Sequence, residues 1–192
     1  MIHGAFTADA ARRHVPRQRA GSHTPVTVQA APGAAPLALA AASDDDFEVL
    51  LSLRMAAMRE SLQRLGRVDP QRARERFSRA FEPAHTRHIL QGGERVGFVV
   101  LLPVPAVQPD HLVLDHPYIA PQAQRQGVGS WVMTQVLFEA DRLGLAVRLT
   151  ALQLSGANRF YEHHHGFELQ HTGEWDLHDL RTARGTADDR QH

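Results

Sequence analysis

The segment Ile119-Ala120-Pro121-Gln122-Ala123-Gln124-Arg125-Gln126-Gly127-Val128-Gly129-Ser130 joins a predicted strand to a predicted helix. An apolar run at 112–114 precedes it, and residues 131–143 follow with helical spacing that ends at Gly144. The last part of the segment, 124–130, is expected to open this helix. The first N–H groups of a helix have no intrahelical partner, and the two glycines let a ligand approach the backbone closely. Together with the helix dipole, these features predict a site for a phosphate or pyrophosphate.

A Gly-x-Gly pattern alone is weak evidence, because a glycine-rich turn without a ligand has the same sequence. It is neither a dinucleotide-binding motif, which has a third glycine, nor a P-loop, which has Gly-Lys-Ser/Thr. The pattern at Gln124, Gly127 and Gly129 resembles the acyl-coenzyme A loop of the GNAT-type N-acetyltransferases, Gln/Arg-x-x-Gly-x-Gly/Ala. Residues 157–167, Ala-Asn-Arg-Phe-Tyr-Glu-His-His-His-Gly-Phe, are similar to that family's Ala-x-x-Phe/Leu-Tyr-x-x-x-Gly-Phe. Both motifs have the family's order and spacing, and the resemblance covers residues 37–180.

Composition limits the class of protein. The chain has 192 residues and 43% hydrophobic residues, which suits one domain with an ordinary core. A formal net charge of zero argues against nucleic acid or an anionic membrane as a partner. The absence of cysteine excludes disulfides, thiolate metal sites and cysteine nucleophiles, and it fits a reducing compartment. No apolar run approaches the ~20 residues of a membrane span, and prolines interrupt the alanine-rich segment 30–42, so we expect a cytoplasmic protein.

The pattern of the chain predicts the element order β-α-α-β-β-β-α-β-α-β-β, a single α/β (α+β) domain with a mixed sheet covered by helices. Apolar spacing and capping residues predict helices at 47–65, 70–82, 131–143 and 156–164. Alternation and turn residues predict strands at 36–42, 86–90, 95–102, 112–114, 146–152, 167–171 and 174–180. The resemblance supplies their arrangement. We expect residues 1–35 to be a disordered arm, 36–180 the acyl-CoA-binding domain and 181–192 a flexible tail.

The resemblance implies that acetyl-CoA is the co-substrate. Its pyrophosphate is expected on the backbone N–H groups of Gln124, Arg125, Gln126, Gly127, Val128, Gly129 and Ser130, with the Arg125 side chain either adding charge or solvated. Backbone N–H groups at the preceding strand end, near Tyr118, Ile119 and Ala120, are expected to polarise the thioester carbonyl. In the family this strand is bulged and parts from its neighbour, and Pro117, which has no N–H, fits a bulge. Asn158 is a further coenzyme-binding candidate, since Leu154 stands where many relatives carry asparagine.

Tyr161 is the predicted general acid. A phenol with an ordinary pKa of ~10 stays neutral and can protonate a departing thiolate. The alternative is a half-buried tyrosine that anchors a short helix. For the general base, Asp115 and His116 both lie near the strand end, and strand alternation sends them to opposite faces. A water chain without a dedicated base is the third alternative.

Two groups of polar residues are assigned no role in chemistry. His163, His164 and His165 diverge by ~100° from one residue to the next in a helix, whereas helical chelation uses i and i+4 pairs, so no metal site is predicted. Four charged residues of the first helix lie off its apolar stripe and are expected on a solvated face: Arg54, Arg59, Glu60 and Arg64. Selection of a substrate carboxylate or amine is the alternative for these four.

The leading hypothesis is an acetyl-CoA-dependent N-acetyltransferase that acts on a primary amine of a small molecule or peptide. Direct transfer in a ternary complex is expected, because the chain has no cysteine and no serine in a nucleophile elbow. The alternatives are a non-catalytic acyl-CoA-binding sensor or regulatory module, and a polyanion-binding protein that uses the basic arm, which the neutral charge balance opposes. The acceptor amine and a homodimeric state are left open.

Overall fold

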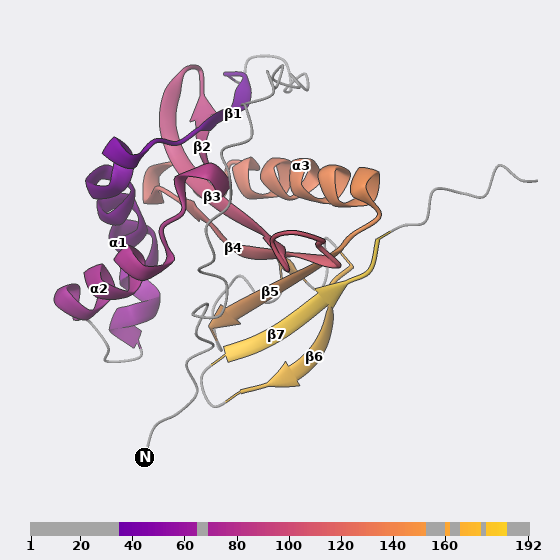
Figure 1. Cartoon of the computed structure of the whole chain (residues 1–192). Helices are drawn as coiled ribbons and strands as arrows, with labels where there is room; N and C mark the ends of the chain where they lie inside the picture. The colour runs from indigo at the N-terminus through magenta and orange to yellow at the C-terminus, as the bar shows by residue number, and fades with distance from the viewer. Residues whose placement is uncertain (1–34, 65–68, 153–159, 162–165, 174–175, 184–192) are drawn as a thin grey trace, which may run out of the picture.

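The computed structural model describes residues 35–64, 69–152, 160–161, 166–173 and 176–183. Within these ranges, a mixed sheet of seven strands has the order β1-β2-β3-β4-β5-β7-β6, from top to bottom in Figure 1. All neighbouring strands are antiparallel except β4 and β5, which are parallel. The strands are β1 (Leu37–Ala41), β2 (Thr86–Gln91), β3 (Glu94–Val104), β4 (His111–Ile119), β5 (Ala146–Leu152), β6 (Glu168–Thr172) and β7 (Asp176–Arg181).

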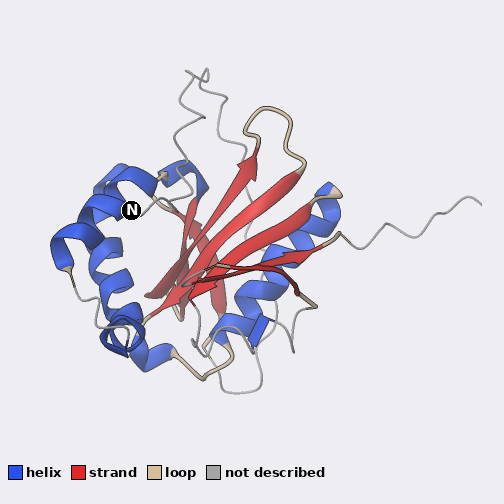
Figure 2. Cartoon of the chain, turned by 90° about the horizontal axis from the view of Figure 1, so that it is seen from below, coloured by secondary structure: helices blue, strands red, loops and turns tan. Residues whose placement is uncertain are grey.

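Helices cover both faces of this sheet. α1 (Phe47–Arg64) and α2 (Pro70–Ala80) lie on one face, and α3 (Val128–Leu143) lies on the other (Figures 1 and 2). The face under α3 carries the larger core, which includes Val99, Leu114 and Val132. The face under α1 and α2 carries a smaller, aromatic-rich core, in which Phe77 contacts Phe98 edge to face with centroids 6.0 Å apart. No helix of the described ranges is long and apolar enough to cross a membrane.

The predicted element order is confirmed wherever the structure describes the chain, while several element boundaries differ from the predicted ones. The arm 1–34 and most of the predicted helix 156–164 lie outside the described residues, although Phe160 and Tyr161 are helical. β4 extends to Ile119, well beyond the predicted 112–114, because pairing with β3 continues through its polar residues. β7 includes Arg181, which was expected to begin the tail.

The start of α3 also corrects the sequence analysis. The helix begins at Val128 and not within 124–127, because two residues of that loop have left-handed backbone conformations. Arg125 has a φ of 60° and Gly127, the N-cap, has a φ of 80°. Such conformations are incompatible with a right-handed helix, and for an arginine they are sterically unfavourable.

Arg181 is ordered because it joins β7 to α3. Its guanidinium donates from Nη1 to Asp141 Oδ1 at 2.9 Å and from Nη2 to Oδ2 at 3.0 Å. Only 7% of the Arg181 side chain is exposed. A two-pronged, largely desolvated pair of this kind fixes both side chains, so the end of β7 is held against the end of α3.

The turn between β1 and α1 is closed by the carboxylate of Asp46. Its Oδ2 accepts hydrogen bonds from Ser43 N and Oγ, both at 2.9 Å, and contacts His88 Nε2 at 3.0 Å. Its Oδ1 accepts from Arg95 Nη2 at 2.9 Å. The Ser43 N–H, and after it the contact with His88, hold the pKa of the Asp46 carboxyl at about 2, below its usual range, although burial acts in the opposite direction.

We expect Asp46→Asn to lower the free energy of unfolding at neutral pH by roughly 1–2 kcal/mol, because hydrogen bonds to a charged group are lost. The folded-state pKa lies below the value of the unfolded chain, so the carboxylate contributes fully above about pH 4. Its contribution is lost as the pH falls toward 2. Urea unfolding between about pH 4 and pH 2 should show that the difference in free energy of unfolding between wild type and Asp46→Asn becomes smaller as the pH falls.

The matched control is Asp45→Asn, which removes an exposed carboxylate from the same turn. This variant should follow the wild-type stability at every pH. A difference between wild type and Asp46→Asn that stays constant down to about pH 2 would contradict the assignment.

Candidate active site

A β-bulge in β4 places two functional side chains on the same face. Tyr118 is paired with Phe98 and Asp115 with Val100, so one residue of β3 faces two residues of β4, His116 and Pro117. Without this extra residue, strand alternation would send the side chains at 115 and 118 to opposite faces. With it, Tyr118 Oη donates a hydrogen bond to Asp115 Oδ1 at 3.1 Å. The bulge expected at Pro117 is thus confirmed.

Beyond the bulge, β4 parts from its other neighbour. β4 and β5 pair in parallel from His111 to Leu114, and β5 then continues to Leu152 in contact with β7 alone. No described strand pairs with the second half of β4 on this side. The main-chain groups along that edge can therefore bind an extended ligand, as a missing strand would.

The three strand-end residues predicted to polarise a carbonyl differ in their availability. Ala120 N donates to Val96 O at 2.8 Å, so this N–H is engaged within the sheet. Successive N–H groups of a strand alternate between its two edges. By this alternation the N–H of Tyr118 also faces β3, whereas the N–H of Ile119 faces the open edge. The carbonyl of Ile119 accepts from Gln124 Nε2 at 2.9 Å, which ties the strand end to the loop.

The loop that follows presents its backbone N–H groups at the start of α3. Trp131 N donates to Gly127 O at 3.0 Å, which closes the first turn of the helix. Within the described part of the chain, the N–H groups from Arg125 to Ser130 have no acceptor. A Cβ placed at Gly127 would meet nothing within 4 Å, so the space in front of the helix is open. These residues fit an anionic group such as a pyrophosphate.

Gly129 connects this loop to the predicted general acid. A Cβ built at Gly129 would lie 3.4 Å from Ile119 Cδ1 and 3.5 Å from Phe160 Cζ. The end of β4, the start of α3 and the Phe160–Tyr161 segment thus meet at one point. The two sequence motifs, which are about thirty residues apart along the chain, lie side by side in the fold.

Tyr161 is deeply buried at this junction, with 2% of the residue exposed. Its ring contacts Phe160 and Phe167 edge to face, with centroids 5.4 and 5.8 Å away. Burial, and after it the proximity of Tyr118, Asp115 and Asp179, raises the pKa of the Tyr161 phenol above its usual value. The hydroxyl is therefore protonated across the neutral range, as a proton donor has to be.

Of the two candidate bases, Asp115 is the one whose side chain the structure describes, and its charge contributes to the raised pKa of Tyr161. The backbone of His116 lies in the bulge, and its side chain is outside the described residues. Asn158, Leu154 and the three histidines 163–165 also lie outside them. Among the residues that are described, no group of three His, Asp or Glu side chains is arranged to hold a metal ion.

The sequence analysis favoured a solvated helix face for Arg54, with substrate selection as the alternative, and the structure separates Arg54 from the other three residues of that group. Arg59, Glu60 and Arg64 are exposed, as expected for a solvated helix face, and Glu60 and Arg64 lie 3.5 Å apart. Arg54 instead is half-buried against the sheet, with its guanidinium carbon 5.4 Å from the centroid of the Tyr118 ring. Its position one turn after the buried Leu50 and Leu51 would have indicated the inner face.

Comparison with known proteins assigns this architecture to a family. Residues 48–167 match the sequence model of the acetyltransferase (GNAT) family. The chain belongs to this family, and it is an acetyl-CoA-dependent acyltransferase. No curated protein matches the chain.

Solved structures share the fold at low sequence identity. The PaiA N-acetyltransferase of Thermoplasma acidophilum, solved with coenzyme A, has a TM-score of 0.62 and 14% identity, covering 76% of this chain and 98% of that chain. The ribosomal-protein-S18-alanine N-acetyltransferase of Escherichia coli has a TM-score of 0.59 and 15% identity, covering 81% and 99%. Ard1 from Thermoplasma volcanium has a TM-score of 0.58 and 18% identity, covering 77% and 98%.

Proposed function

We propose that this protein transfers the acetyl group of acetyl-CoA directly to a primary amine of a small molecule or peptide. The observation that carries the proposal is the meeting of three features at one point. These are the open edge of β4, the unpaired N–H groups at the start of α3, and the Phe160–Tyr161 segment. A similar fold, that of PaiA, was solved with coenzyme A, which supports the same ligand here.

The coenzyme would be held by main-chain groups. The N–H groups from Arg125 to Ser130 are proposed to bind its pyrophosphate, since they are at the positive end of the α3 dipole. The N–H of Gln124, predicted to join them, instead donates to Pro121 O at 3.3 Å. The open edge of β4 would bind its extended arm, and the N–H of Ile119 would donate to the thioester carbonyl. The Arg125 side chain is exposed and adds positive charge nearby. Coenzyme binding by Asn158 stays a prediction.

Acetyl-CoA supplies an activated acetyl group, and the chain provides positions and protons. As the new C–N bond forms and the C–S bond breaks, Tyr161 Oη gives a proton to the sulfur. The acceptor ammonium loses two protons in all. Asp115, or a water that it positions, passes the first to solvent before the attack, and the second replaces the proton that left Tyr161. The His116 side chain stays an alternative base.

The direct test is release of free coenzyme A thiol from acetyl-CoA in the presence of amines, amino acids, polyamines and peptides. At least one class should give turnover well above hydrolysis, with a new amide detected by mass spectrometry. Tight binding of acetyl-CoA without transfer to any acceptor would instead favour the alternative, a coenzyme-sensing or regulatory module. The cytoplasmic location, the homodimer and the domain limits 36–180 stay predictions.

A further inference from the structure

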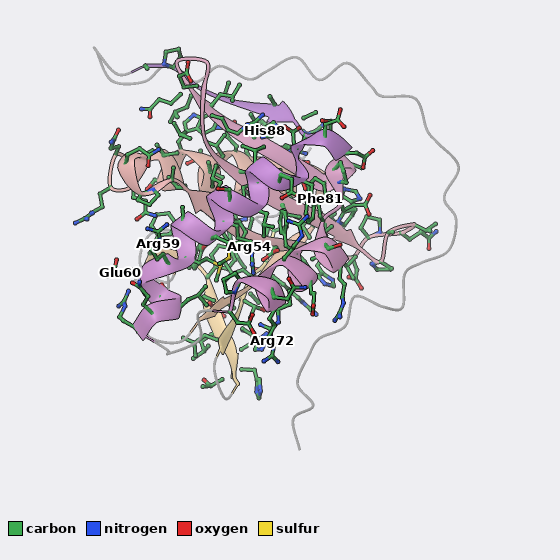
Figure 3. All side chains as sticks on the ribbon, turned by 90° about the vertical axis from the view of Figure 1, so that its left-hand side faces the viewer. Arg54, Arg59, Glu60, Arg72, Phe81 and His88 are labelled. Atoms are coloured by element: carbon green, nitrogen blue, oxygen red, sulfur yellow. The ribbon has the colours of Figure 1, made fainter. Side chains whose placement is uncertain are left out.

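Arg54 is the charged residue of α1 that faces the sheet. Its guanidinium carbon lies 5.4 Å from the Tyr118 ring centroid and 6.0 Å from that of Phe77. In Figure 3 it lies beside the middle of α1, whereas the labels of Arg59 and Glu60 mark the outer end of the helix. The two rings hold the planar guanidinium in place, which lowers the entropy that it would lose on binding a ligand.

This guanidinium forms no salt bridge with a carboxylate of the residues that the structure describes, although Asp115 attracts it from a greater distance. In the parts of the chain that the structure describes, no carboxylate oxygen lies within 4.0 Å of Arg54. Other arginines nearby are paired, Arg74 with Glu48 and Arg64 with Glu60. The Arg54 side chain has a hydrogen-bond interaction with the Tyr118 side chain. An arginine has five N–H donors, so Arg54 can also bind a carboxylate that arrives with a ligand.

Asp115 provides the opposite charge on the same tyrosine. It accepts the hydrogen bond of Tyr118 Oη, while Arg54 lies over the Tyr118 ring. The Asp115 carboxylate and the Arg54 guanidinium thus interact electrostatically, but they do not form an ion pair. A negative and a positive group held slightly apart in this way are complementary to a ligand that carries an ammonium and a carboxylate on neighbouring carbons.

We propose that the acceptor is an amino carboxylate, such as a free amino acid, whose carboxylate binds Arg54 while its amine lies at Asp115. This inference rests on the proposed function and names its substrate class. The guanidinium fork matches a carboxylate with two parallel hydrogen bonds, which would fix the acceptor's orientation. Asp115, at which the amine would bind, also interacts electrostatically with Tyr161, the proposed proton donor.

The test compares free amino acids with their α-amides, which keep the amine and the side chain but lose the carboxylate charge. With the full-length protein and saturating acetyl-CoA, wild type should acetylate the best free acid about 10- to 100-fold more efficiently, in kcat/KM, than its amide. Arg54→Gln should abolish this preference mainly by raising KM for the free acid. Arg54→Lys, which keeps the charge without the fork, should retain part of it.

Arg59→Gln is the matched control, since it removes an exposed charge from the same helix and should leave the preference unchanged. Two results would overturn the inference. One is a wild type that acetylates other amines but does not prefer free acids, which would leave the proposed function intact. The other is an equal loss on acid and amide in a folded Arg54→Gln, which would make Arg54 a packing residue only.

If no amine is acetylated, the carboxylate site can still be tested by measuring ligand binding, independently of the proposed function. Calorimetry of the protein with coenzyme A can compare N-acetyl amino acids with N-acetyl amino amides. Tighter binding of the acids that disappears in Arg54→Gln would support the carboxylate site even while the proposed function failed. Equal binding of acids and amides would overturn the carboxylate site.

Discussion

Replacing Tyr161 by phenylalanine should lower kcat by about 10²–10⁴-fold while the protein stays folded. This corresponds to ~3–5 kcal/mol of barrier. The substitution removes one oxygen and keeps the edge-to-face contacts with Phe160 and Phe167. Acetyl-CoA should bind with nearly unchanged affinity, because the loop and the β4 edge hold it. The loss should appear in kcat more than in KM, as for a group that acts in the transition state.

Packing and proton donation can be separated by a control at the neighbouring ring. Phe167→Leu disturbs the packing of Tyr161 but keeps its hydroxyl, so it should cost stability on the order of 1 kcal/mol and little turnover. Steady-state kinetics measure the turnover of each variant, and thermal melting curves measure its stability. Because the pKa of Tyr161 is raised, the phenol keeps its proton throughout the neutral pH range. Deprotonation of Tyr161 should therefore not lower the kcat of the wild type in that range. If folded Tyr161→Phe has the kcat of the wild type, Tyr161 is not the general acid.

A carboxylate at the start of α3 should weaken coenzyme binding and yet preserve or raise stability. Ser130 is exposed and lies in the first turn, three residues after the N-cap Gly127. In Ser130→Glu the new charge interacts favourably with the helix dipole, by roughly 0.3–1 kcal/mol. The same charge would repel a bound pyrophosphate. Two like charges about 4 Å apart repel by ~1–4 kcal/mol, so the affinity for acetyl-CoA should fall by about fivefold to several hundredfold.

Ser130→Gln is the control, because it has the size of glutamate without the charge and should bind the coenzyme nearly as wild type does. Calorimetric titration with acetyl-CoA at low salt measures affinity, and a thermal scan measures stability. The opposite signs expected for affinity and stability exclude simple unfolding as the cause. Unchanged affinity in Ser130→Glu would mean that the pyrophosphate does not lie at this helix end.

The fold could be predicted from the sequence because its elements are separated by strong local features. Asp69 and Pro70 start α2, Gly92 and Gly93 turn β2 into β3, and Gly144 ends α3. Each depends on the conformational preference of one or two residues, which a sequence displays directly. The arrangement of the strands depends on pairing over long distances, and it came from the resemblance.

The candidate site could be predicted only in part, because its geometry arises from pairing between strands. The alternation of β4 alone sends residues 115 and 116 to opposite faces, and only the register with β3 shows that Asp115 joins Tyr118. The engagement of Ala120 N–H with Val96 is a long-range contact of the same kind. The sequence did not separate Arg54 from Arg59, Glu60 and Arg64, because all four lie off the apolar stripe of the helix. Only the fold brings the rings of Phe77 and Tyr118 against Arg54.

The strand order β5-β7-β6 has a consequence for how the chain folds during synthesis. β7 is the last strand along the chain, yet it lies between β5 and β6 in the sheet. Until Arg181 has left the ribosome, β5 has no partner on that side, and its exposed edge can pair with other chains. A stalled or truncated product that ends before β7 should therefore aggregate. Completion of the described sheet therefore depends on β7, which follows its six other strands along the chain.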